Sequence, residues 1–524
     1  MKMLRPQITL MVLVILLTAV PGFGQNGTVP SEIEQFAADW VLPNKDYANT
    51  RFTTDSVIDS SNVARLGVAW TFQVPGVSAW GAAASNPIIA GDVVYIQDLR
   101  SNVFALQRDT GEAIWERIYD NEVTGPNGVG IGHGSLFIAS GVDEFSALDL
   151  QTGETVWSRL TDQRPTGAIQ PVVYDDFLFI TSQAGVAGSG EVDYAGYAGG
   201  TSGHLYALDH ATGETIWEFQ IVEEGFWGNP DVNSGGGTWY PPAIDTERGS
   251  IFWGTGNPAP FPGTIEFPNA SSRPGENRYT NALVSFDYVT GEMLWYYLAK
   301  PYDLFDLDFQ ISPVLGTATI DGEPRDIVIG AGKLGRVVAL DRETGEVIWD
   351  TPVGIHQNDE LREVPPGEVV EVYPGILGGV ETPMALADGV LYVPVLNLPT
   401  PYTATGWDAE TGTDAVQAAE ARTEIARGTG ELNAIDINTG EILWIQEFDA
   451  PVFGAATVVN DLVFTSTFDG VIYAFLREDG TEVWRYQTEG GINAWPAVAG
   501  DMLIVPVGLA SPPYVLALQL GEGE

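Results

Sequence analysis

Four residues near the middle of the chain have the types and spacing that could do chemistry. Asp303, Asp306 and Asp308 lie in the run KPYDLFDLDF, and Asn257 follows an apolar run in IFWGTGNPAP. An amide oxygen and two carboxylates can hold a hard cation, and a carboxylate can also take a proton from a substrate. Acids in such loops are also common turn formers, and Asp303 taken alone is more typical of a turn. The rest of the chain should then be a frame that presents this site.

The composition limits the classes of partner. The chain has 70 acidic against 23 basic residues, a formal net charge of −47, and no cysteine. Nucleic acid is therefore not an expected partner, because phosphate binding needs basic patches. Disulfides, thiolate metal sites and covalent c-type haem attachment are excluded together. The acidic charge is typical of a solubility device in a saline environment, and alternatively of a field that steers a basic electron carrier.

The start of the chain predicts export. Residues 1–24 combine a basic start, an apolar run over residues 8–20, and the small residues Gly22 and Gly24 before a plausible cut, which is the pattern of a secretory signal peptide. No cysteine follows that could carry a lipid, and no second apolar run is long enough to cross a bilayer. We expect a periplasmic or secreted protein with no transmembrane anchor after signal removal.

Internal repetition is the strongest signal in the sequence. A unit of the form Ala-Leu-Asp-x-x-Thr-Gly-Glu-x-x-Trp recurs, and each copy has an alternating apolar strand, a turn with glycine, and a second strand. The copies end at Trp115, Trp157, Trp217, Trp295, Trp349, Trp444 and Trp484. Another pair of strand-like runs precedes each unit, so each repeat predicts one four-stranded blade of a β-propeller.

The two ends of the chain predict an eighth blade. The run ARLGVAWTF, with Trp70, lacks preceding strands, and the run YVLALQL at 514–520 lacks a following one, so their pairing would close the ring. We therefore expect an all-β, eight-bladed propeller over residues 61–524, an N-terminal extension over 25–60, and tryptophans that pack between blades. The tryptophan spacing widens between Trp157 and Trp444, and such insertions usually become loops that carry the function.

The repeats and the central stretch together resemble the quinoprotein alcohol dehydrogenases, which are eight-bladed propellers that use pyrroloquinoline quinone (PQQ) and a metal ion. The runs WVLPNKDYANTR and NVARLGVAW resemble the opening signature of that family. The runs GTGNPAP, RPGENRYT and PYDLFDLDF follow in the same order as in the enzymes. The repeat alone would also be shared with non-enzymatic propellers such as outer-membrane assembly scaffolds.

The resemblance implies a role for each matching residue. It implies Ca²⁺ or a lanthanide bound by Asn257, Asp306 and Asp308, with Asp306 and Lys333 as the catalytic pair. It implies PQQ contacts from Thr166, Ser182, Thr238, Trp239, Lys333 and Asn397. In this scheme Asp306 accepts the hydroxyl proton of an alcohol while hydride moves to the quinone, and an external periplasmic cytochrome takes the electrons. Asn257 and Lys333 could alternatively be ordinary loop residues, and Trp239 could be another tryptophan that packs between blades.

Some positions depart from the family pattern. Asn127 and Gly128 stand where the family has an adjacent cysteine pair, and His133 stands where it has an arginine. The metal-binding glutamate should fall near Gly185, and Ala168 is in register with a cofactor-binding threonine. The resemblance thus implies a largely kept metal half and a remodelled cofactor rim. The alternative function is a secreted propeller that serves as a binding or assembly scaffold.

Overall fold

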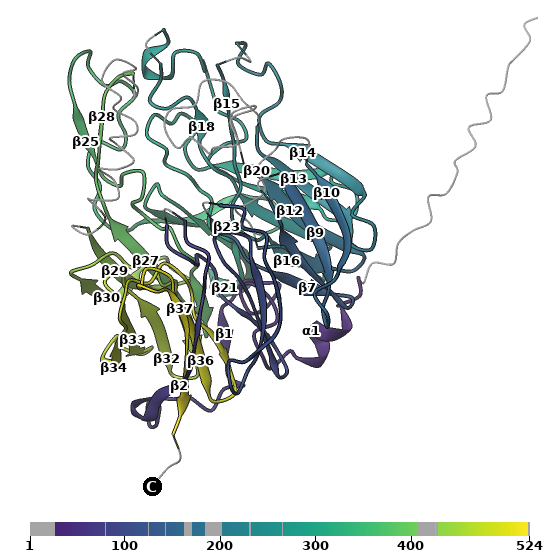
Figure 1. Cartoon of the computed structure of the whole chain (residues 1–524). Coiled ribbons are helices and arrows are strands. Elements are labelled where there is room, and N and C mark those ends of the chain that lie inside the picture. Colours follow the sequence, from purple (N-terminus) through teal and green to yellow (C-terminus); the bar gives the residue numbers. More distant parts are fainter. Residues whose placement is uncertain are drawn as a thin grey trace, which may run out of the picture.

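The chain folds as a closed ring of eight four-stranded antiparallel blades, seen in the computed structural model (Figure 1). The structure describes residues 27–521 apart from 79, 124, 142, 162–169, 184–201, 230–231, 265, 406–424 and 426–427. The predicted eight-bladed propeller is confirmed. The expected signal peptide lies outside the described residues. No described helix is long and apolar enough to cross a membrane.

The first four blades follow the chain in order. Blade 1 comprises β3 (Ile88–Ala90), β4 (Val93–Gln97), β5 (Val103–Gln107) and β6 (Ala113–Arg117). Blade 2 comprises β7 (Gly130–Gly132), β8 (Ser135–Ala139), β9 (Glu144–Asp149) and β10 (Thr155–Leu160). Blade 3 comprises β11 (Val172–Tyr174), β12 (Phe177–Ser182), β13 (His204–Asp209) and β14 (Thr215–Gln220). Blade 4 comprises β16 (Ala243–Asp245), β17 (Ser250–Gly254), β19 (Ala282–Asp287) and β20 (Met293–Leu298).

The remaining blades complete the circle. Blade 5 comprises β21 (Val314–Ile320), β22 (Glu323–Ala331), β23 (Arg336–Asp341) and β24 (Val347–Pro352). Blade 6 comprises β26 (Ala385–Ala387), β27 (Val390–Asn397), β29 (Thr429–Asp436) and β30 (Ile442–Phe448). Blade 7 comprises β31 (Thr457–Val459), β32 (Leu462–Ser466), β33 (Val471–Leu476) and β34 (Glu482–Gln487). Blade 8 comprises β35 (Ala497–Ala499), β36 (Met502–Val507), β37 (Tyr514–Leu520) and, from the other end of the chain, β2 (Leu66–Gln73).

The N-terminal segment joins the ring at two places. β2 pairs antiparallel with β37, with Trp70 opposite Ala517, so the first and last propeller strands share one blade. β1 (Phe52–Thr53) adds a parallel strand to β31 of blade 7. Arg51, fully buried, donates to the carbonyl oxygen of Ala456 at 2.8 Å and to Asn44 Oδ1 at 3.0 Å. The described part of the predicted N-terminal extension, residues 27–60, is therefore packed into the ring.

The repeated tryptophan fastens most blades to the next. The indole Nε1 of Trp295 donates to the carbonyl oxygen of Arg342, in the following blade, at 3.1 Å. Gly345 lies under the same ring with φ +72°, and a Cβ there would come within 2.6 Å of an indole carbon. Glycine is required because a side chain would be both strained and too close. Among the described residues, six indoles, that of Trp295 included, make this bond to the following blade: Trp70, Trp157, Trp217, Trp295, Trp349 and Trp444.

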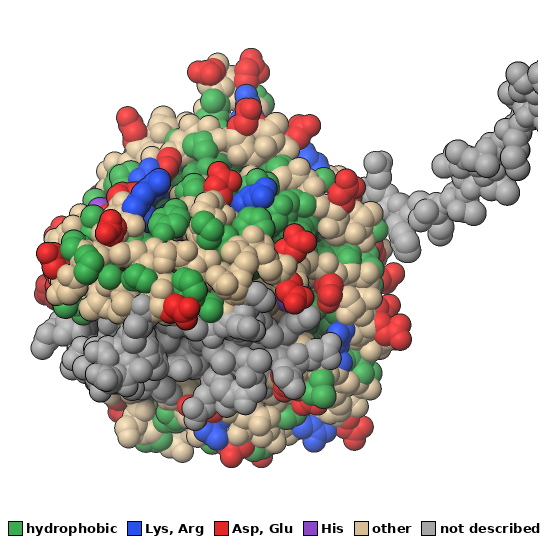
Figure 2. Space-filling model, turned by 90° about the horizontal axis from the view of Figure 1, so that it is seen from above, with side chains coloured by type: hydrophobic (Ala, Val, Ile, Leu, Met, Phe, Trp, Pro, Cys, Tyr) green, Lys and Arg blue, Asp and Glu red, His purple; other side chains and the backbone are tan. Residues whose placement is uncertain are grey.

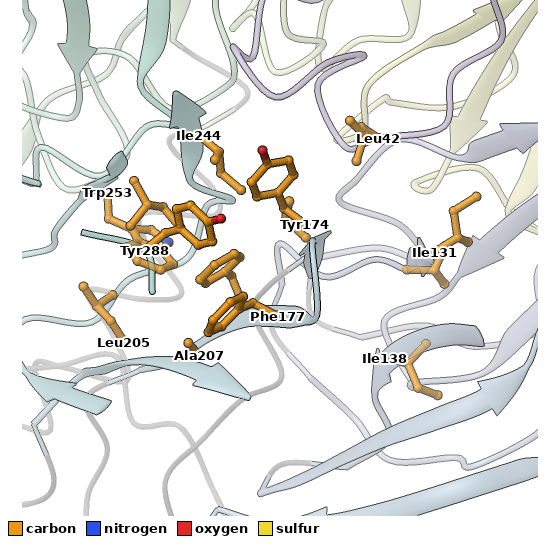
Figure 3. Packing of buried hydrophobic residues seen from close by; sticks show 14 of the residues in the cluster. Leu42, Ile131, Ile138, Tyr174, Phe177, Leu205, Ala207, Ile244, Trp253 and Tyr288 are labelled. Atoms are coloured by element: carbon orange, nitrogen blue, oxygen red, sulfur yellow. The ribbon is translucent and has the colours of Figure 1, made fainter. Parts of the chain in front are cut away.

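Aromatic side chains fill the space between blades 3 and 4. In Figure 3, Tyr174, Phe177 and Tyr288 point toward one another, with Trp253 beside them. Tyr288 packs edge-on against Tyr174 and Phe177, with ring centroids 5.3 Å and 5.4 Å apart. Such pairs add to the burial of apolar area and hold the two blades in one relative position.

The two faces of the ring differ in their connections. The turn face carries the tight turns between first and second and between third and fourth strands, together with α1 (Ser31–Gln35), whose Glu32 accepts from the backbone N–H of Gly134. The loop face carries the longer connections after the second and fourth strands (Figure 1). Those after second strands include β18 (Pro258–Ala259) and β28 (Thr400–Tyr402), and those after fourth strands include β15 (Ser234–Gly235) and β25 (Val370–Val372). The described residues also include the 3₁₀ turns η1 (Val63–Arg65) and η2 (Pro268–Ala270). Asp and Glu side chains are spread over the surface seen in Figure 2, with few Lys and Arg among them.

Candidate active site

Lys333 and two of the predicted acids form one buried ionic cluster on the loop face. Lys333 follows β22, and its Nζ lies 2.8 Å from Asp306 Oδ2 and 2.7 Å from Asp308 Oδ2. All three residues are buried. Both acids belong to the connection between blades 4 and 5, and Asp306 has a φ of 60° that bends the chain between them. The alternating spacing of Asp306 and Asp308 thus brings both carboxylates to one ammonium group.

Backbone contacts bring Asn257 to the same place. Asn257 comes just after β17, and its backbone N–H donates to Asp308 Oδ1. The preceding Gly256 donates its N–H to the carbonyl oxygen of Gly237 at 2.7 Å. A Cβ on Gly256 would lie 2.7 Å from that oxygen, so the close approach requires glycine. The asparagine, the two acids and the segment carrying Thr238 therefore meet in one small region.

Trp239 lies flat beneath the cluster, and Thr238 lies beside it. Lys333 Nζ sits 4.4 Å from the centre of the Trp239 ring, which is within cation–π range. The backbone oxygen of Thr238 accepts from Thr181 Oγ1 at 2.6 Å, which fixes the position of this segment. Within the described part of the chain, the buried Thr238 hydroxyl has no hydrogen-bond partner. A flat aromatic face and an unpaired hydroxyl are groups that a polar, planar ligand would use.

The charges of the cluster depend strongly on one another. Burial raises the pKa of Asp306 well above its ordinary value, and the neighbouring Lys333 ammonium opposes that rise. Burial also raises the pKa of Asp308, to about 6, again opposed by Lys333. Burial alone would lower the pKa of Lys333, but the charges of Asp306 and Asp308 outweigh it and raise that pKa. The lysine therefore stays protonated, and the acids are basic enough to accept a proton.

Sequence reasoning missed a second layer of polar residues behind Lys333. Gln310 accepts from the backbone N–H of Lys333 at 3.3 Å and donates to Glu381 Oε2 at 3.0 Å. Tyr240 donates to the backbone oxygen of Glu381. Burial raises the pKa of Glu381 to about 8, with Lys333 opposing the rise. Gln310 continues the alternation of Asp306 and Asp308, so spacing alone could have found it, whereas no local pattern marks Glu381.

The remaining predicted cofactor residues are held by protein contacts. Ser182 ends β12, and its Oγ accepts from the backbone N–H of His204 at 3.1 Å. Asn397 ends β27, accepts from the N–H of Ile355 at 2.9 Å, and donates to Glu431 Oε1 at 2.9 Å. Both residues end second strands, on the same face as Lys333. Thr166 lies outside the described residues, as do Ala168 and Gly185.

Asp303 has the structural role that is expected of a turn-forming residue. Its Oδ1 accepts from the N–H of Phe305 at 2.9 Å, and its Oδ2 accepts from the N–H of Leu307 and from Asn281 Nδ2, each at 2.9 Å. Asp303 thus fixes the loop that carries Asp306 and Asp308.

The structure corrects one expected correspondence. His133 occupies the turn between β7 and β8, on the turn face, where its Nε2 lies 2.7 Å from the carbonyl oxygen of Asp175. It does not reach the loop face, so its match to an arginine beside the cofactor is wrong. Asn127, by contrast, is buried before the first strand of blade 2 and donates to the carbonyl oxygen of Asp98 at 2.9 Å.

The residues present fit a hard cation beside a planar cofactor. Carboxylate oxygens are ligands that Ca²⁺ and lanthanide ions prefer, and those of Asp306 and Asp308 meet at one point, with the backbone of Asn257 against Asp308. The Trp239 face and the unpaired hydroxyl of Thr238 supply a floor and a polar contact beside them. These groups are the reason why the site fits a cation and a planar cofactor.

Two family models match the chain. The model described as the β-propeller domain of glucose, ethanol and alcohol dehydrogenases matches residues 168–370, the part that contains Asn257, Asp306, Asp308 and Lys333. The model described as outer membrane protein assembly factor BamB matches residues 47–219 and 382–515, more than half of the chain. Both models describe propellers of the PQQ type.

Curated relatives and solved structures agree with the first model. The quinohemoprotein alcohol dehydrogenase of Comamonas testosteroni is 26% identical over 527 residues, covering 88% of this chain and 70% of the relative. The lanthanide-dependent methanol dehydrogenase of Methylorubrum extorquens is 25% identical over 524 residues, covering 87% and 84%. The crystal structure of the Comamonas enzyme superposes with a TM-score of 0.77 at 22% identity, over 93% of this chain and 81% of that one.

These matches define the class of the protein. The chain belongs to the PQQ-type β-propeller family. Within that family it is an oxidoreductase of the quinoprotein alcohol dehydrogenase type.

Proposed function

We propose that the chain oxidises an alcohol to an aldehyde or ketone, using PQQ and one hard cation, Ca²⁺ or a lanthanide. The observation that carries the proposal is the buried cluster of Lys333, Asp306 and Asp308 above the Trp239 ring. This cluster lies in the segment that the dehydrogenase model matches. A scaffold has no use for two buried acids around a lysine, because burying charge costs free energy.

Each residue of the cluster has a distinct role in this proposal. Asp306 accepts the hydroxyl proton of the alcohol at its carboxylate, and Asn257, Asp306 and Asp308 hold the cation. Lys333 donates hydrogen bonds toward negative charge that develops beside it. Trp239 supports the ring system, with Thr166, Ser182, Thr238 and Asn397 as the other cofactor contacts. When bound, PQQ supplies the hydride acceptor and the cation polarises its reacting carbonyl.

The test is a titration of the purified protein with PQQ, in Ca²⁺ and separately in La³⁺. Quinone absorbance reports binding, and dye-linked oxidation of a small alcohol reports turnover. We expect saturable binding and turnover in wild type, and turnover lost by about 10²-fold or more in Asp306→Asn. The exposed Asp321→Asn, in the turn between β21 and β22, is the matched control and should keep both. Absence of PQQ binding with either ion would refute the proposal.

The partners and location belong to the same proposal. A periplasmic site of action is supported by the signal-peptide pattern of residues 1–24. The reduced cofactor must pass its electrons to an external carrier such as a cytochrome c, because the chain has no cysteine for a covalent haem. An acidic surface such as that in Figure 2 would suit a basic carrier.

A second candidate function is a binding or assembly scaffold, favoured by the match of residues 47–219 and 382–515 to the assembly-factor model. It predicts that neither PQQ nor a cation binds near Lys333. The titration therefore separates the two candidates directly.

A further inference from the structure

Two histidines and an aspartate meet on the turn face, away from the ionic cluster. The ligating atoms of His133, Asp176 and His210 all lie within 4.8 Å of one another. His210 is half-buried, and Asp176 is exposed. Two imidazoles and a carboxylate form a donor set typical of zinc and related divalent ions.

The fold brings these residues together from two adjacent blades. His133 lies in the turn between β7 and β8 of blade 2, and Asp176 lies in the corresponding turn of blade 3. His210 follows β13, and its backbone N–H donates to the carbonyl oxygen of Asp176 at 3.2 Å. The indole of Trp157 in blade 2 donates to the carbonyl oxygen of His210 at 3.0 Å. The docking repeat thus fixes the backbone at this point.

The repeat itself does not require a histidine at this position. Only the backbone carbonyl is used to dock the tryptophan, and the equivalent residues in other blades are Arg108, Tyr288 and Ile437. The side chain of His210 is therefore available for another role.

The hydrogen bonding of His133 leaves one of its ring nitrogens free to bind a metal. His133 Nε2 lies 2.7 Å from the carbonyl oxygen of Asp175, so this nitrogen carries the proton and Nδ1 is left as an acceptor. The rings of His133 and His210 stack with centroids 4.0 Å apart and an interplanar angle of 20°. Burial, together with the neighbouring His133, lowers the pKa of His210. Neutral imidazole is the form that binds a metal.

We propose that His133, Asp176 and His210 bind one late first-row divalent cation such as Zn²⁺, with solvent in the fourth position. Tetrahedral ligands at about 2 Å from zinc lie about 3.3 Å from one another, so the side chains must turn inward on binding. The Asp176 side chain is 72% exposed and free to make this movement. The ion would tie the turns of blades 2 and 3 to each other and would stabilise the folded ring by mass action.

The test is calorimetric titration of the full chain with Zn²⁺ in excess Ca²⁺, which occupies sites made of oxygen ligands alone. We expect one Zn²⁺ to bind wild type, with affinity reduced at least tenfold in His210→Gln. His356→Gln is the matched control, because His356 also pairs with one aspartate, Asp359, at 2.8 Å but has no second histidine in that pair. Equal affinity in wild type and His210→Gln, or an equal loss in His356→Gln, would overturn the proposal.

Two further measurements do not depend on how His210→Gln folds. Asp176→Asn changes an exposed turn residue and should weaken Zn²⁺ binding while leaving the circular dichroism spectrum unchanged. X-ray absorption of the zinc-loaded wild type should show two imidazole ligands. A spectrum with oxygen ligands alone would overturn the proposal.

Discussion

The buried carboxyl of Glu381 makes a quantitative prediction about the pH dependence of stability. Glu381 lies behind Lys333 and is 7% exposed. Within the described part of the chain, its Oε1 has no hydrogen-bond partner. Burial raises its pKa from the ordinary value of 4.5 to about 8. The folded state therefore favours the protonated acid, so the stability that this group contributes is fully present below pH 4.5 and is lost as the pH rises to about 8.

The size of the effect follows from these two values. Each pKa unit corresponds to about 1.4 kcal/mol, so Glu381 should lower the free energy of unfolding by about 4 kcal/mol between pH 4.5 and 8. Glu381→Gln cannot titrate, and its amide oxygen can still accept from Gln310. The variant should lose this part of the pH dependence and should be more stable than wild type at pH 8.

The assay is denaturant unfolding of both proteins from pH 5 to 9, with a chelator present. Asp308, whose pKa is raised to about 6 by burial, titrates in the same range in both proteins, so only the difference between them is interpreted. Glu292→Gln, at an exposed turn position, is the control and should match wild type. Parallel pH curves for wild type and Glu381→Gln would refute the reasoning.

Three further predictions concern the frame and the cluster. Gly345→Ala should destabilise the fold by more than about 2 kcal/mol, because it adds a clash with Trp295 to the strain of a positive φ. Gly500→Ala is the control: Gly500 has φ +59° and open space around it, so the variant should cost only about 1–2 kcal/mol. Arg51→Met should cost about 3 kcal/mol or more, because it leaves buried acceptors unpaired. Lys333→Met should cost about 3–5 kcal/mol at pH 8 and much less at pH 5, because protonated acids need no counter-charge. Denaturant unfolding measures all three.

The fold was predictable because its signal is repeated. The Asp-x-x-Thr-Gly turn recurs with the same bonds: Asp149 Oδ1, for example, accepts from the backbone N–H of Thr152 at 2.8 Å. Each copy specifies the same turn and the same tryptophan contact, so a copy that departs from the pattern does not change the predicted fold. The pairing of the strand around Trp70 with the last strand followed from the need to protect two edges.

The site was only partly predictable because its parts come from different loops. Asp306, Asp308 and Gln310 share one alternating run, and local spacing could place them on one side. Glu381 reaches the cluster through the backbone contact of Val380 with Gly332, at 3.0 Å, which depends on how blades 5 and 6 pack. No local pattern reports such a contact. The predicted place of His133 beside the cofactor was wrong for a similar reason. Alignment to a family motif does not show at which end of a strand the aligned residue lies.

The buried acids around Lys333 stand out against the acidic composition of the whole chain. The chain has a net charge of −47, and most of the acids in the described residues are not buried, so they cost little free energy. Asp306, Asp308 and Glu381 are buried around a single ammonium, that of Lys333. One positive charge cannot neutralise three carboxylates, and burial raises the pKa of each of them accordingly. The folded ring therefore holds a region that gains stability from added positive charge, which is the electrostatic condition that a cation-binding site must meet.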